Sequence, residues 1–369
     1  MKRNPFRLLL APFALLYGIG ISLRNLAYST GLFKSTSFDI PIVCIGNLST
    51  GGTGKTPHTE YLVTLLKDKL NIATLSRGYG RKTDEFILSD IHSTAEQIGD
   101  EPKQIKNKFP EIPVAVDAKR VNGINKLREA HPELDLVLLD DAFQHRAVKP
   151  EFSILLTPYS DLFINDYLLP VGNLREWKSG YKRADIVIVT KCPEILSPLD
   201  RRAIKDDLKP YSYQSVYFSY FKYGEIQPAD QSRYEPHPIS RVKKAFVFTG
   251  IANSSTLTDY LNTNNVSYEH RKFSDHHSYS KTEIEALINE FNAYNLNHDS
   301  IILTTEKDYM RIKDSELEEL FRAIPLYYIP IEVAFHGNDG QEMNAQITDY
   351  VRKNQIHRSV SQGQHNGQT

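Results

Sequence analysis

The sequence predicts an α/β protein with a mostly parallel sheet and helices on both faces of that sheet. From residue 39 onward, short runs of β-branched and other apolar residues alternate with longer segments of helical periodicity. The short runs are apolar at nearly every position, as expected of strands covered on both faces in a parallel sheet. A long uncharged run near the N-terminus predicts one further helix ahead of the sheet.

That uncharged run, residues 8–23, lies within residues 1–38, which contain no Asp or Glu. It is shorter than the roughly 20 residues of a transmembrane helix, and no small-residue cleavage site of a signal peptide follows it. We expect a retained membrane anchor, spanning the bilayer or lying in its interface; a buried core helix is the alternative. The basic residues that would contact anionic headgroups are Lys2, Arg3, Arg7, Arg24 and Lys34.

The main sheet is expected to begin directly after this segment. Two helices, over residues 57–66 and 120–130, are expected to connect its strands. The predicted strands cover residues 42–45, 72–75, 114–116, 136–139, 154–156 and 186–189.

A second region follows a loop-like stretch rich in Tyr and Pro, at about residues 211–240. Ser280 and Glu283 form a capping box ahead of a helix over residues 280–291. The polar residues 354–369 predict a disordered tail. Further strands are predicted over residues 245–248, 301–303 and 326–329.

Charge and cysteine content exclude several classes of function. The chain of 369 residues has 44 Lys and Arg against 45 Asp and Glu, so no global field attracts nucleic acid. The two cysteines, Cys44 and Cys192, are far apart and favour neither a disulfide framework nor a zinc site. No protein partner is evident.

Residues 46–57, GNLSTGGTGKTP, follow the first predicted strand and precede a helix. Strand, glycine loop and helix are the context of a phosphate-binding P-loop, because backbone N–H groups and the helix N-terminus point together at an anion. Lys55 would contact the β- and γ-phosphates and Thr56 would ligate Mg²⁺, although the usual first glycine is replaced by Ser49. The nucleotide-binding set is Ser49, Thr50, Gly51, Gly52, Thr53, Gly54, Lys55 and Thr56.

The run LVLLDDAFQHR, residues 136–146, predicts a buried strand that ends in acidic residues. Asp140 fits a Walker B carboxylate that holds Mg²⁺ directly or through water, and Asp141 lies next to it. Gln144 and His145 would border the same crevice at the carboxyl ends of the strands. Lys191 follows a strand at which many P-loop proteins recognise the base; no Asp completes a guanine-specific NKxD, which favours ATP.

Five further motifs suggest an acceptor site: SRGYGRK (76–82), IGDEP (98–102), LLPVGNLREW (168–177), FSDHHSY (273–279) and LTTEKD (303–308). With GGTGKTP and DDAFQH, they resemble the tetraacyldisaccharide 4'-kinases, the lipid A disaccharide kinases of Gram-negative bacteria, in order and spacing from the N-terminal segment to about Asp308. The resemblance implies a membrane anchor at 1–38, a P-loop kinase domain at 39–210 and a C-terminal α/β region at 211–353.

The resemblance further implies transfer of the γ-phosphate of ATP, with Mg²⁺, to the 4'-hydroxyl of tetraacyldisaccharide 1-phosphate at the cytoplasmic face of the inner membrane. Asp100 matches the family's catalytic carboxylate and His276 the histidine that orients it, with Lys55 as the third catalytic residue. The residues alone leave other roles open, since Asp100 could be a turn former and DHH a metal cluster or solvated loop.

The remaining expectations concern metal and substrate. Glu176 and Glu306 would help to arrange metal or substrate, and Trp177 would add an aromatic ring to the membrane surface. A solvated basic loop is the alternative for Arg77, Arg81 and Lys82. The predicted metal ligands are Thr56, Asp140, Asp141 and Glu176, and the predicted substrate-binding residues are Asn47, Arg77, Tyr79, Arg81, Gln144 and His145.

Two alternative functions remain. A membrane-associated switch ATPase or GTPase shares GGTGKT, but the lysine that such proteins place before the glycines is Thr50 here. A kinase of a soluble sugar or nucleotide leaves the apolar run 8–23 without a purpose. Because Asp100 and His276 belong to different predicted regions, closure of the two regions on ATP is a further hypothesis.

Overall fold

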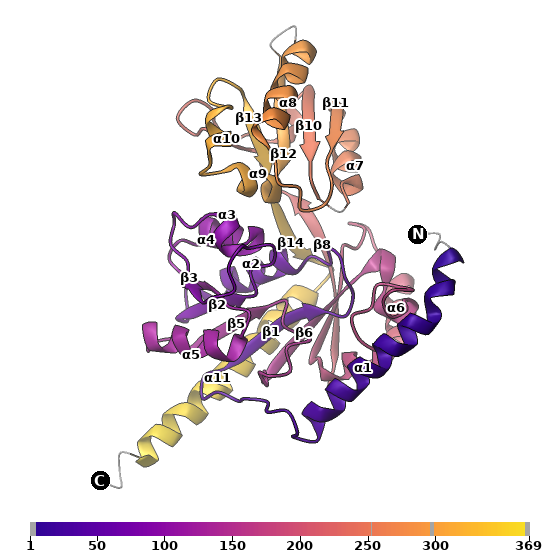
Figure 1. The fold of residues 1–369 in the computed structure, drawn as a ribbon, viewed down its shortest axis with the longest axis vertical. Coiled ribbons are helices and arrows are strands. Elements are labelled where there is room, and N and C mark those ends of the chain that lie inside the picture. The colour runs from indigo at the N-terminus through magenta and orange to yellow at the C-terminus, as the bar shows by residue number, and fades with distance from the viewer. Residues whose placement is uncertain (1–4, 252, 296–298, 366–369) are drawn as a thin grey trace.

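Two lobes make up the molecule, joined by strands that run from one to the other (Figure 1). The computed structural model describes residues 5–251, 253–295 and 299–365. Within these residues, a nine-stranded sheet forms the large lobe and a five-stranded sheet forms the small lobe. The predicted α/β class is confirmed.

The large sheet is parallel except at its two edges, where β14 and β3 run antiparallel to their neighbours. β1 lies in the middle, between β5 and β6, so the loop after β1 reaches the centre of the carboxyl edge. In order, the strands are β14 (Ile331–Phe335), β8 (Ser215–Tyr223), β7 (Ile186–Thr190), β6 (Phe152–Pro158), β1 (Ile42–Asn47), β5 (Leu136–Asp140), β2 (Ile72–Ser76), β4 (Val114–Val116) and β3 (Ile87–Leu88).

Helices cover both faces of this sheet, as predicted. Alternate residues of β1 face opposite sides: Val43 and Ile45 pack in one apolar core, Ile42 and Cys44 in the other. The first core contains α2 (Lys55–Leu66), α4 (Asp100–Lys108) and α11 (Asp339–His365), and the second contains α5 (Arg120–Ala130) and α6 (Pro198–Leu208). A short α3 (Ala95–Ile98) precedes α4, and 3₁₀ turns cover Tyr159–Asp161, Phe163–Asn165, Lys178–Arg183 and Ile239–Arg241.

The small lobe repeats this arrangement on a smaller scale. The predicted capping box is confirmed: the Ser280 hydroxyl accepts a hydrogen bond from the Glu283 N–H, and the Glu283 carboxylate accepts one from the Ser280 N–H. Its strand order is β11 (Ser267–Lys272), β10 (Lys244–Thr249), β12 (Ser300–Thr305), β13 (Leu326–Ile329) and β9 (Gln227–Pro228). Its helices are α7 (Ser255–Thr263), α8 (Lys281–Tyr294), α9 (Glu306–Ile312) and α10 (Glu316–Glu319).

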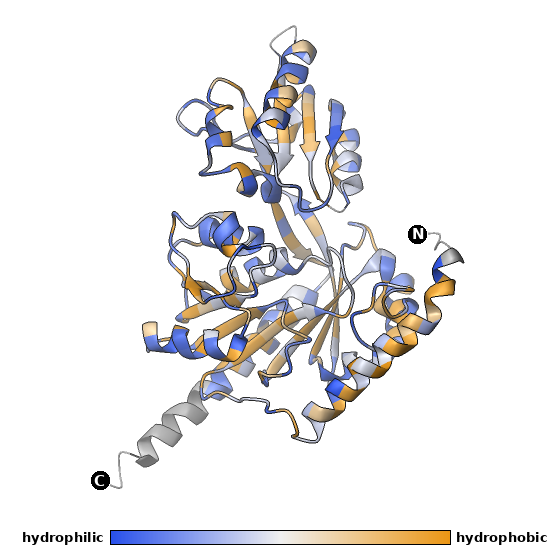
Figure 2. Ribbon diagram, in the orientation of Figure 1, coloured by the Kyte–Doolittle hydropathy of each residue, from blue (hydrophilic) through white to orange (hydrophobic). Residues whose placement is uncertain are grey.

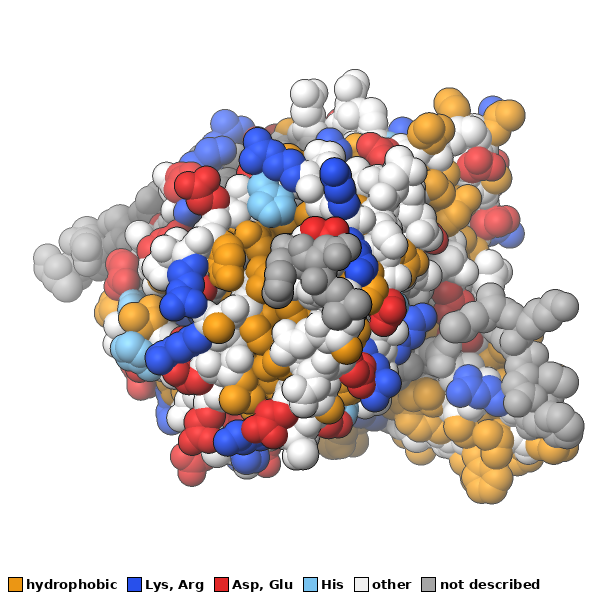
Figure 3. All heavy atoms as spheres, turned by 90° about the horizontal axis from the view of Figure 1, so that it is seen from above, with side chains coloured by type: hydrophobic (Ala, Val, Ile, Leu, Met, Phe, Trp, Pro, Cys, Tyr) orange, Lys and Arg blue, Asp and Glu red, His pale blue; other side chains and the backbone are white. Residues whose placement is uncertain are grey.

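The N-terminal segment forms a 3₁₀ turn, Pro5–Leu10, and then α1, Ala11–Ser29, along the outside of the large lobe. Most of α1 is hydrophobic (Figure 2), and apolar side chains gather where it projects from the body (Figure 3). Residues 7–29 are long and apolar enough to cross a membrane, and 6% of their most apolar window is buried. The buried-core alternative is therefore wrong, whereas membrane association fits. Lys2 and Arg3 lie outside the described residues.

Three predictions at the C-terminal end need correction. The stretch after residue 211 was expected to be a loop, but it contains β8, whose partly exposed tyrosines hide its strand character. Together with β14 and α11, β8 belongs to the large lobe, so residues 211–353 are not one region. Helix α11 continues to His365, where a disordered tail was expected, because a helix nucleated by packed turns extends at little cost.

Candidate active site

The loop between β1 and α2 has the geometry of an anion site. Gly51 and Gly54 have φ of 100° and 93°, a left-handed region that glycine adopts without steric cost. A Cβ at Gly54 would lie 2.9 Å from Cζ of Phe221. Lys55 and Thr56 open α2, whose first turn contains no acidic residue. The positive end of the helix dipole therefore faces the loop without a compensating side chain.

The inner side of the loop is held by buried polar groups. Nδ2 of Asn47 donates to Oγ1 of Thr53 over 3.0 Å, and the hydroxyl of Thr190 donates to the Thr53 carbonyl over 2.7 Å. The guanidinium of Arg175 contacts Oδ1 of Asn47. Asn47, a predicted substrate contact, is fully buried and instead fixes the shape of the loop.

The outer side of the loop pairs with the LLPVGNLREW segment. Ser49 forms a β-bridge with Leu174, and the backbone N–H of Thr50 donates to the carbonyl of Asn173 over 2.8 Å. These contacts explain why the segment belongs with the phosphate loop although more than a hundred residues separate them.

Lys191 directly follows β7, and its side chain reaches the phosphate loop. Its Nζ is 3.8 Å from the position that a Cβ at Gly52 would occupy. Burial lowers the pKa of Lys191, and the charges of Lys55 and Lys307 lower it further. The ammonium of Lys191 at this loop, close enough to that of Lys55 for the two charges to interact, favours a polyanionic phosphate.

Two adjacent carboxylates, Asp140 and Asp141, lie at the end of β5. Burial, followed by the charge of Asp141, raises the pKa of Asp140 to about 6. Burial opposes ionisation of Asp141 as well, but Lys55 at 3.6 Å and Arg175 at 2.9 Å hold its pKa below the ordinary value. Asp140 accepts a hydrogen bond from Thr59 and has no cation within ion-pair distance among the described residues. Such a carboxylate suits a divalent cation.

Glu176 already has partners on both carboxylate oxygens. Nη2 of Arg183 lies 2.7 Å and 2.9 Å from them, and Nε2 of Gln144 donates to Oε1 over 3.0 Å. The same Gln144 amide donates to the carbonyl of Asn47 over 2.7 Å. Glu176 thus connects Arg183 to the strand before the phosphate loop and orients Gln144; its predicted role at the metal stays a prediction.

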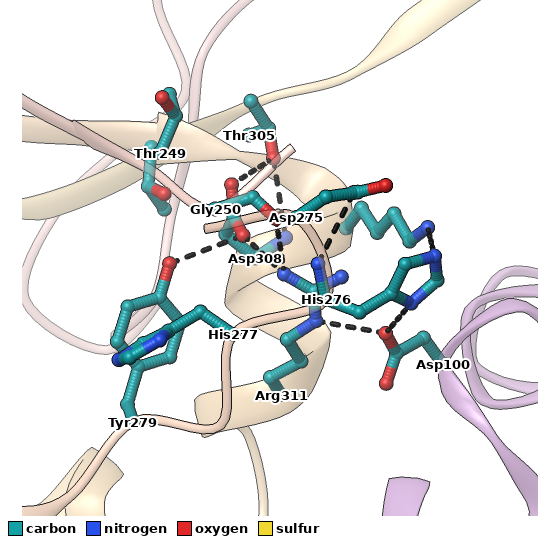
Figure 4. A network of polar contacts seen from close by, with 12 residues as sticks. Asp100, Thr249, Gly250, Asp275, His276, His277, Tyr279, Thr305, Asp308 and Arg311 are labelled. Atoms are coloured by element: carbon teal, nitrogen blue, oxygen red, sulfur yellow. Dashed lines mark hydrogen bonds and ion pairs between the residues drawn. The ribbon is translucent and has the colours of Figure 1, made fainter. Parts of the chain in front are cut away.

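Asp100 and His276 meet at the junction of the lobes (Figure 4). Asp100 opens α4 of the large lobe, and His276 lies on the loop after β11 of the small lobe with a φ of 55°. Their Oδ2 and Nδ1 atoms are 3.2 Å apart. Arg311 of α9 donates from Nε to the same Oδ2 over 2.8 Å, a contact that sequence reasoning missed.

The remaining predicted substrate residues line the edge beyond β2 and β5. Tyr79 is 70% exposed, and its ring stands edge-on to His276 at 5.5 Å. Arg77 is exposed, whereas Arg81 is anchored by a 2.5 Å hydrogen bond to the carbonyl of Glu85. Lys82 forms an exposed ion pair with Glu96 at 2.8 Å, which supports the alternative of a solvated basic loop for Lys82 alone.

His145 lies among three arginines. Burial, followed by the charges of Arg120, Arg24 and Arg77, lowers its pKa to about 4, so the ring is neutral at pH 7. Arg120 is 1% exposed and was missed, because no local pattern marks an arginine at the start of α5. The cluster carries net positive charge, which favours a nearby anionic group.

A cavity of about 920 Å³ adjoins this cluster between the end of α1 and the large lobe. Both apolar and basic groups line it, including Phe33, Phe143, Lys34, Arg146 and Arg183. Its position beside the apolar helix suits a ligand that has an anionic head and hydrocarbon chains.

A phosphate loop, an acidic pair on the neighbouring strand and a carboxylate–histidine pair opposite them define the class of P-loop phosphotransferases. The chain belongs to the tetraacyldisaccharide-1-P 4'-kinase family, whose model matches residues 6–352. The resemblance stated from the sequence is confirmed.

Proteins that are similar to this chain over nearly their whole length are named tetraacyldisaccharide 4'-kinases. The tetraacyldisaccharide 4'-kinase of Flavobacterium johnsoniae is 45% identical, over 95% of this chain and 99% of that protein. The corresponding protein of Bacteroides thetaiotaomicron is 42% identical, over 96% and 95%. LpxK of Aquifex aeolicus, solved in complex with ATP, is 25% identical with a TM-score of 0.71, covering 93% of this chain and 99% of that one.

Proposed function

We propose that this protein transfers the γ-phosphate of ATP to the 4'-hydroxyl of tetraacyldisaccharide 1-phosphate, a step of lipid A biosynthesis. Membership in the kinase family and the names of full-length relatives support this activity. The observation that carries it is the contact between Asp100 and His276, which lie 3.2 Å apart although they come from different lobes. Such a pair can accept the proton of an attacking hydroxyl, as a kinase requires.

In the proposed reaction, Oδ1 of Asp100 accepts the proton of the 4'-hydroxyl while the hydroxyl oxygen bonds to the γ-phosphorus. The bond from that phosphorus to the β,γ-bridging oxygen breaks, and ADP leaves. Phosphoryl transfer has a loose transition state, so positioning and charge neutralisation matter more than a strong base. Lys55, Lys191 and the N–H groups of residues 51–56 supply the positive charge around the phosphates.

Mg²⁺ is the proposed cofactor, with Thr56, Asp140 and Asp141 as its ligands. Bound there, it would neutralise charge on the β- and γ-phosphates. The donor set of one hydroxyl and two carboxylates fits, because Mg²⁺ usually takes one or two carboxylates and completes its shell with water and phosphate. Among the described residues, no group of three or more His, Cys, Asp or Glu forms a metal site without the nucleotide.

The acceptor is proposed to reach the site from the bilayer. The apolar face of α1 would rest in the cytoplasmic side of the inner membrane, where anionic lipids meet its basic flanks. The cavity beside α1 would hold the acylated disaccharide, and the arginines around His145 would hold its 1-phosphate. The switch ATPase gains no support, since the comparisons favour the lipid kinase.

The test is transfer of labelled γ-phosphate from ATP to tetraacyldisaccharide 1-phosphate in detergent micelles. We expect Lys55→Ala and Asp100→Ala each to reduce labelled lipid by about 100-fold or more. Matched controls are Arg352→Ala and Asp349→Ala, an exposed ion pair on α11, which should leave transfer unchanged.

The two variants should differ in nucleotide binding. Lys55→Ala should weaken ATP binding, measured by titration calorimetry, while Asp100→Ala should keep it. Release of free phosphate without labelled lipid, insensitive to Asp100→Ala, would instead establish an ATPase.

A further inference from the structure

Arg311 on α9 is fixed by its own lobe before it reaches Asp100. Its Nη1 donates to Oδ1 of Asp308 over 2.6 Å and to the carbonyl of Gly250 over 2.8 Å. Asp308 in turn accepts hydrogen bonds from the hydroxyls of Tyr279 at 3.1 Å and Thr305 at 2.7 Å (Figure 4). The Arg311 side chain is 6% exposed. A guanidinium held at several points has little freedom, so its Nε points in one direction.

The two donors to Asp100 use one oxygen. Both Nε of Arg311 and Nδ1 of His276 lie within hydrogen-bond distance of Oδ2, at 2.8 Å and 3.2 Å. In the described part of the chain, no hydrogen bond involves Oδ1 of Asp100. The carboxylate is therefore fixed in rotation, with one oxygen held and the other free to accept a proton.

Lys307, one helical turn before Arg311, determines which ring nitrogen of His276 accepts a hydrogen bond. Its Nζ is 3.2 Å from Nε2 of His276 and forms an ion pair with Glu101 at 2.9 Å. An ammonium only donates, so Nε2 accepts and the ring proton of the neutral imidazole lies on Nδ1, toward Asp100. Both contacts on Oδ2 are then N–H donors to a carboxylate.

We propose that Arg311 is a positioning residue for Asp100: it holds Oδ2 from the small lobe and so presents Oδ1 to the acceptor hydroxyl. The inference rests on the proposed role of Asp100 as the base. It makes α9 part of the active site, because the base is correctly oriented only while α9 lies against α4.

The electrostatics agree with this geometry. Burial alone would raise the pKa of Asp100, but the hydrogen bond from His276 and the charge of Arg311 outweigh it and hold the pKa below the ordinary value. Without Arg311, less positive charge opposes the effect of burial, and the pKa of Asp100 rises. The charged and titratable groups near Asp100 are Glu101 on α4, Lys307, Asp308 and Arg311 on α9, Asp275 and His276 after β11, and Tyr79 after β2.

The experiment measures kcat/KM for lipid phosphorylation from pH 3 to 8 with full-length protein in micelles, because the pKa of Asp100 lies below its ordinary value. Arg311→Gln should reduce kcat/KM by about 100-fold, as expected when a reacting group is misplaced. Its acid limb should move to higher pH by about one unit or more. Arg311→Lys should recover part of kcat/KM and bring the acid limb most of the way back to its position in the parent. The control Arg322→Gln, which changes an exposed arginine of the same lobe, should match the parent.

A double-mutant cycle separates positioning from a purely structural effect. If Arg311 acts through Asp100, adding Arg311→Gln to Asp100→Asn should cause no further loss. An unchanged kcat/KM in Arg311→Gln would overturn the inference. The inference would also be overturned if Arg311→Gln lowered kcat/KM without moving the acid limb of the pH profile, and if this loss multiplied with the loss caused by Asp100→Asn.

Unfolding must be distinguished from both results. Melting temperatures are recorded for every variant, and if Arg311→Gln does not fold, the same cycle is run with Arg311→Lys. Lysine keeps the charge but cannot donate to Asp100 and Asp308 in one plane, so a reduced rate without further loss in the Asp100→Asn background supports positioning. A parent-like rate overturns it. A parent that labels no lipid refutes the proposed function itself.

Discussion

The phosphate loop and the contact between α4 and α9 each supply charged groups to the candidate active site, but the chain builds them differently. The loop is contiguous in sequence, and its shape depends on glycine backbone and one helix end. In the second region, Asp100 and Arg311 are 211 residues apart and meet only because two lobes touch. The nucleotide site is thus local, whereas the proposed acceptor site depends on docking of the lobes.

The docking contact is polar. Lys103 pairs with Asp314 at 2.6 Å, and Nε2 of Gln104 contacts Glu306 at 3.3 Å. Interfaces of this kind between domains commonly permit relative motion. Closure on ATP stays a prediction, and the contact between Asp100 and His276 in the structure is consistent with it.

The largest effect that sharpens this comparison is expected from His276→Ala. It should lower kcat for lipid phosphorylation about 10- to 100-fold, since Oδ2 of Asp100 loses one of its two donors. The dissociation constant for ATP should stay the same, because the phosphate loop does not depend on the small lobe. The control is His277→Ala, whose ring contacts Glu283 at 3.0 Å. A weakened ATP affinity in His276→Ala would break the separation between the two regions.

A smaller effect concerns pH. Burial, followed by the negative charge of Glu60, raises the pKa of Glu306 at the α4–α9 contact from 4.5 to about 7. The folded state holds this proton more tightly than the unfolded state, so stability is fully present below pH 4.5 and falls as the pH rises to about 7.

Replacing Glu306 with glutamine removes this cost. Glu306→Gln should raise the melting temperature by about 2–4 °C at pH 8 and change it little at pH 5. Exposed Glu285→Gln on α8 serves as the control. Equal shifts at both pH values would show that the carboxyl of Glu306 does not titrate in this range.

An effect of similar size extends the comparison to α1. Nε1 of Trp177 donates to the carbonyl of Gly18 at 3.1 Å and to Oγ of Ser22 at 2.9 Å, so Trp177 holds α1 to the large lobe, a role that the sequence did not predict. Trp177→Ala should lower the melting temperature by about 2–4 °C and leave vesicle binding nearly unchanged.

Exposed apolar residues of α1 provide the contrast. Leu16→Asp, at a position 66% exposed, should reduce sedimentation with anionic vesicles while the melting temperature stays the same. Equal vesicle binding by Leu16→Asp and the parent would place the membrane contact elsewhere.

Periodicity and local motifs predicted the strands that are buried on both faces, together with the phosphate loop and the acidic end of β5. They missed strands such as β11, whose sequence SYEHRK is polar because it forms an edge, and β8, whose exposed tyrosines resemble a loop. Asp100 and His276 were found only through the family resemblance, since each alone fits a turn or a solvated loop.

By itself, therefore, the sequence determined what depends on neighbouring residues: the fold class, the capped helices, the glycine backbone of the phosphate loop and the apolar character of α1. Only the tertiary structure decided which charges meet. In the folded chain, Glu176 pairs with Arg183, Lys191 lies over the phosphate loop and Arg311 contacts Asp100. The physical reason is that backbone conformation and hydrophobic burial depend on patterns among neighbouring residues. An ion pair requires only that two charged side chains come within a few ångströms of each other in the fold, and no repeating pattern in the sequence marks it.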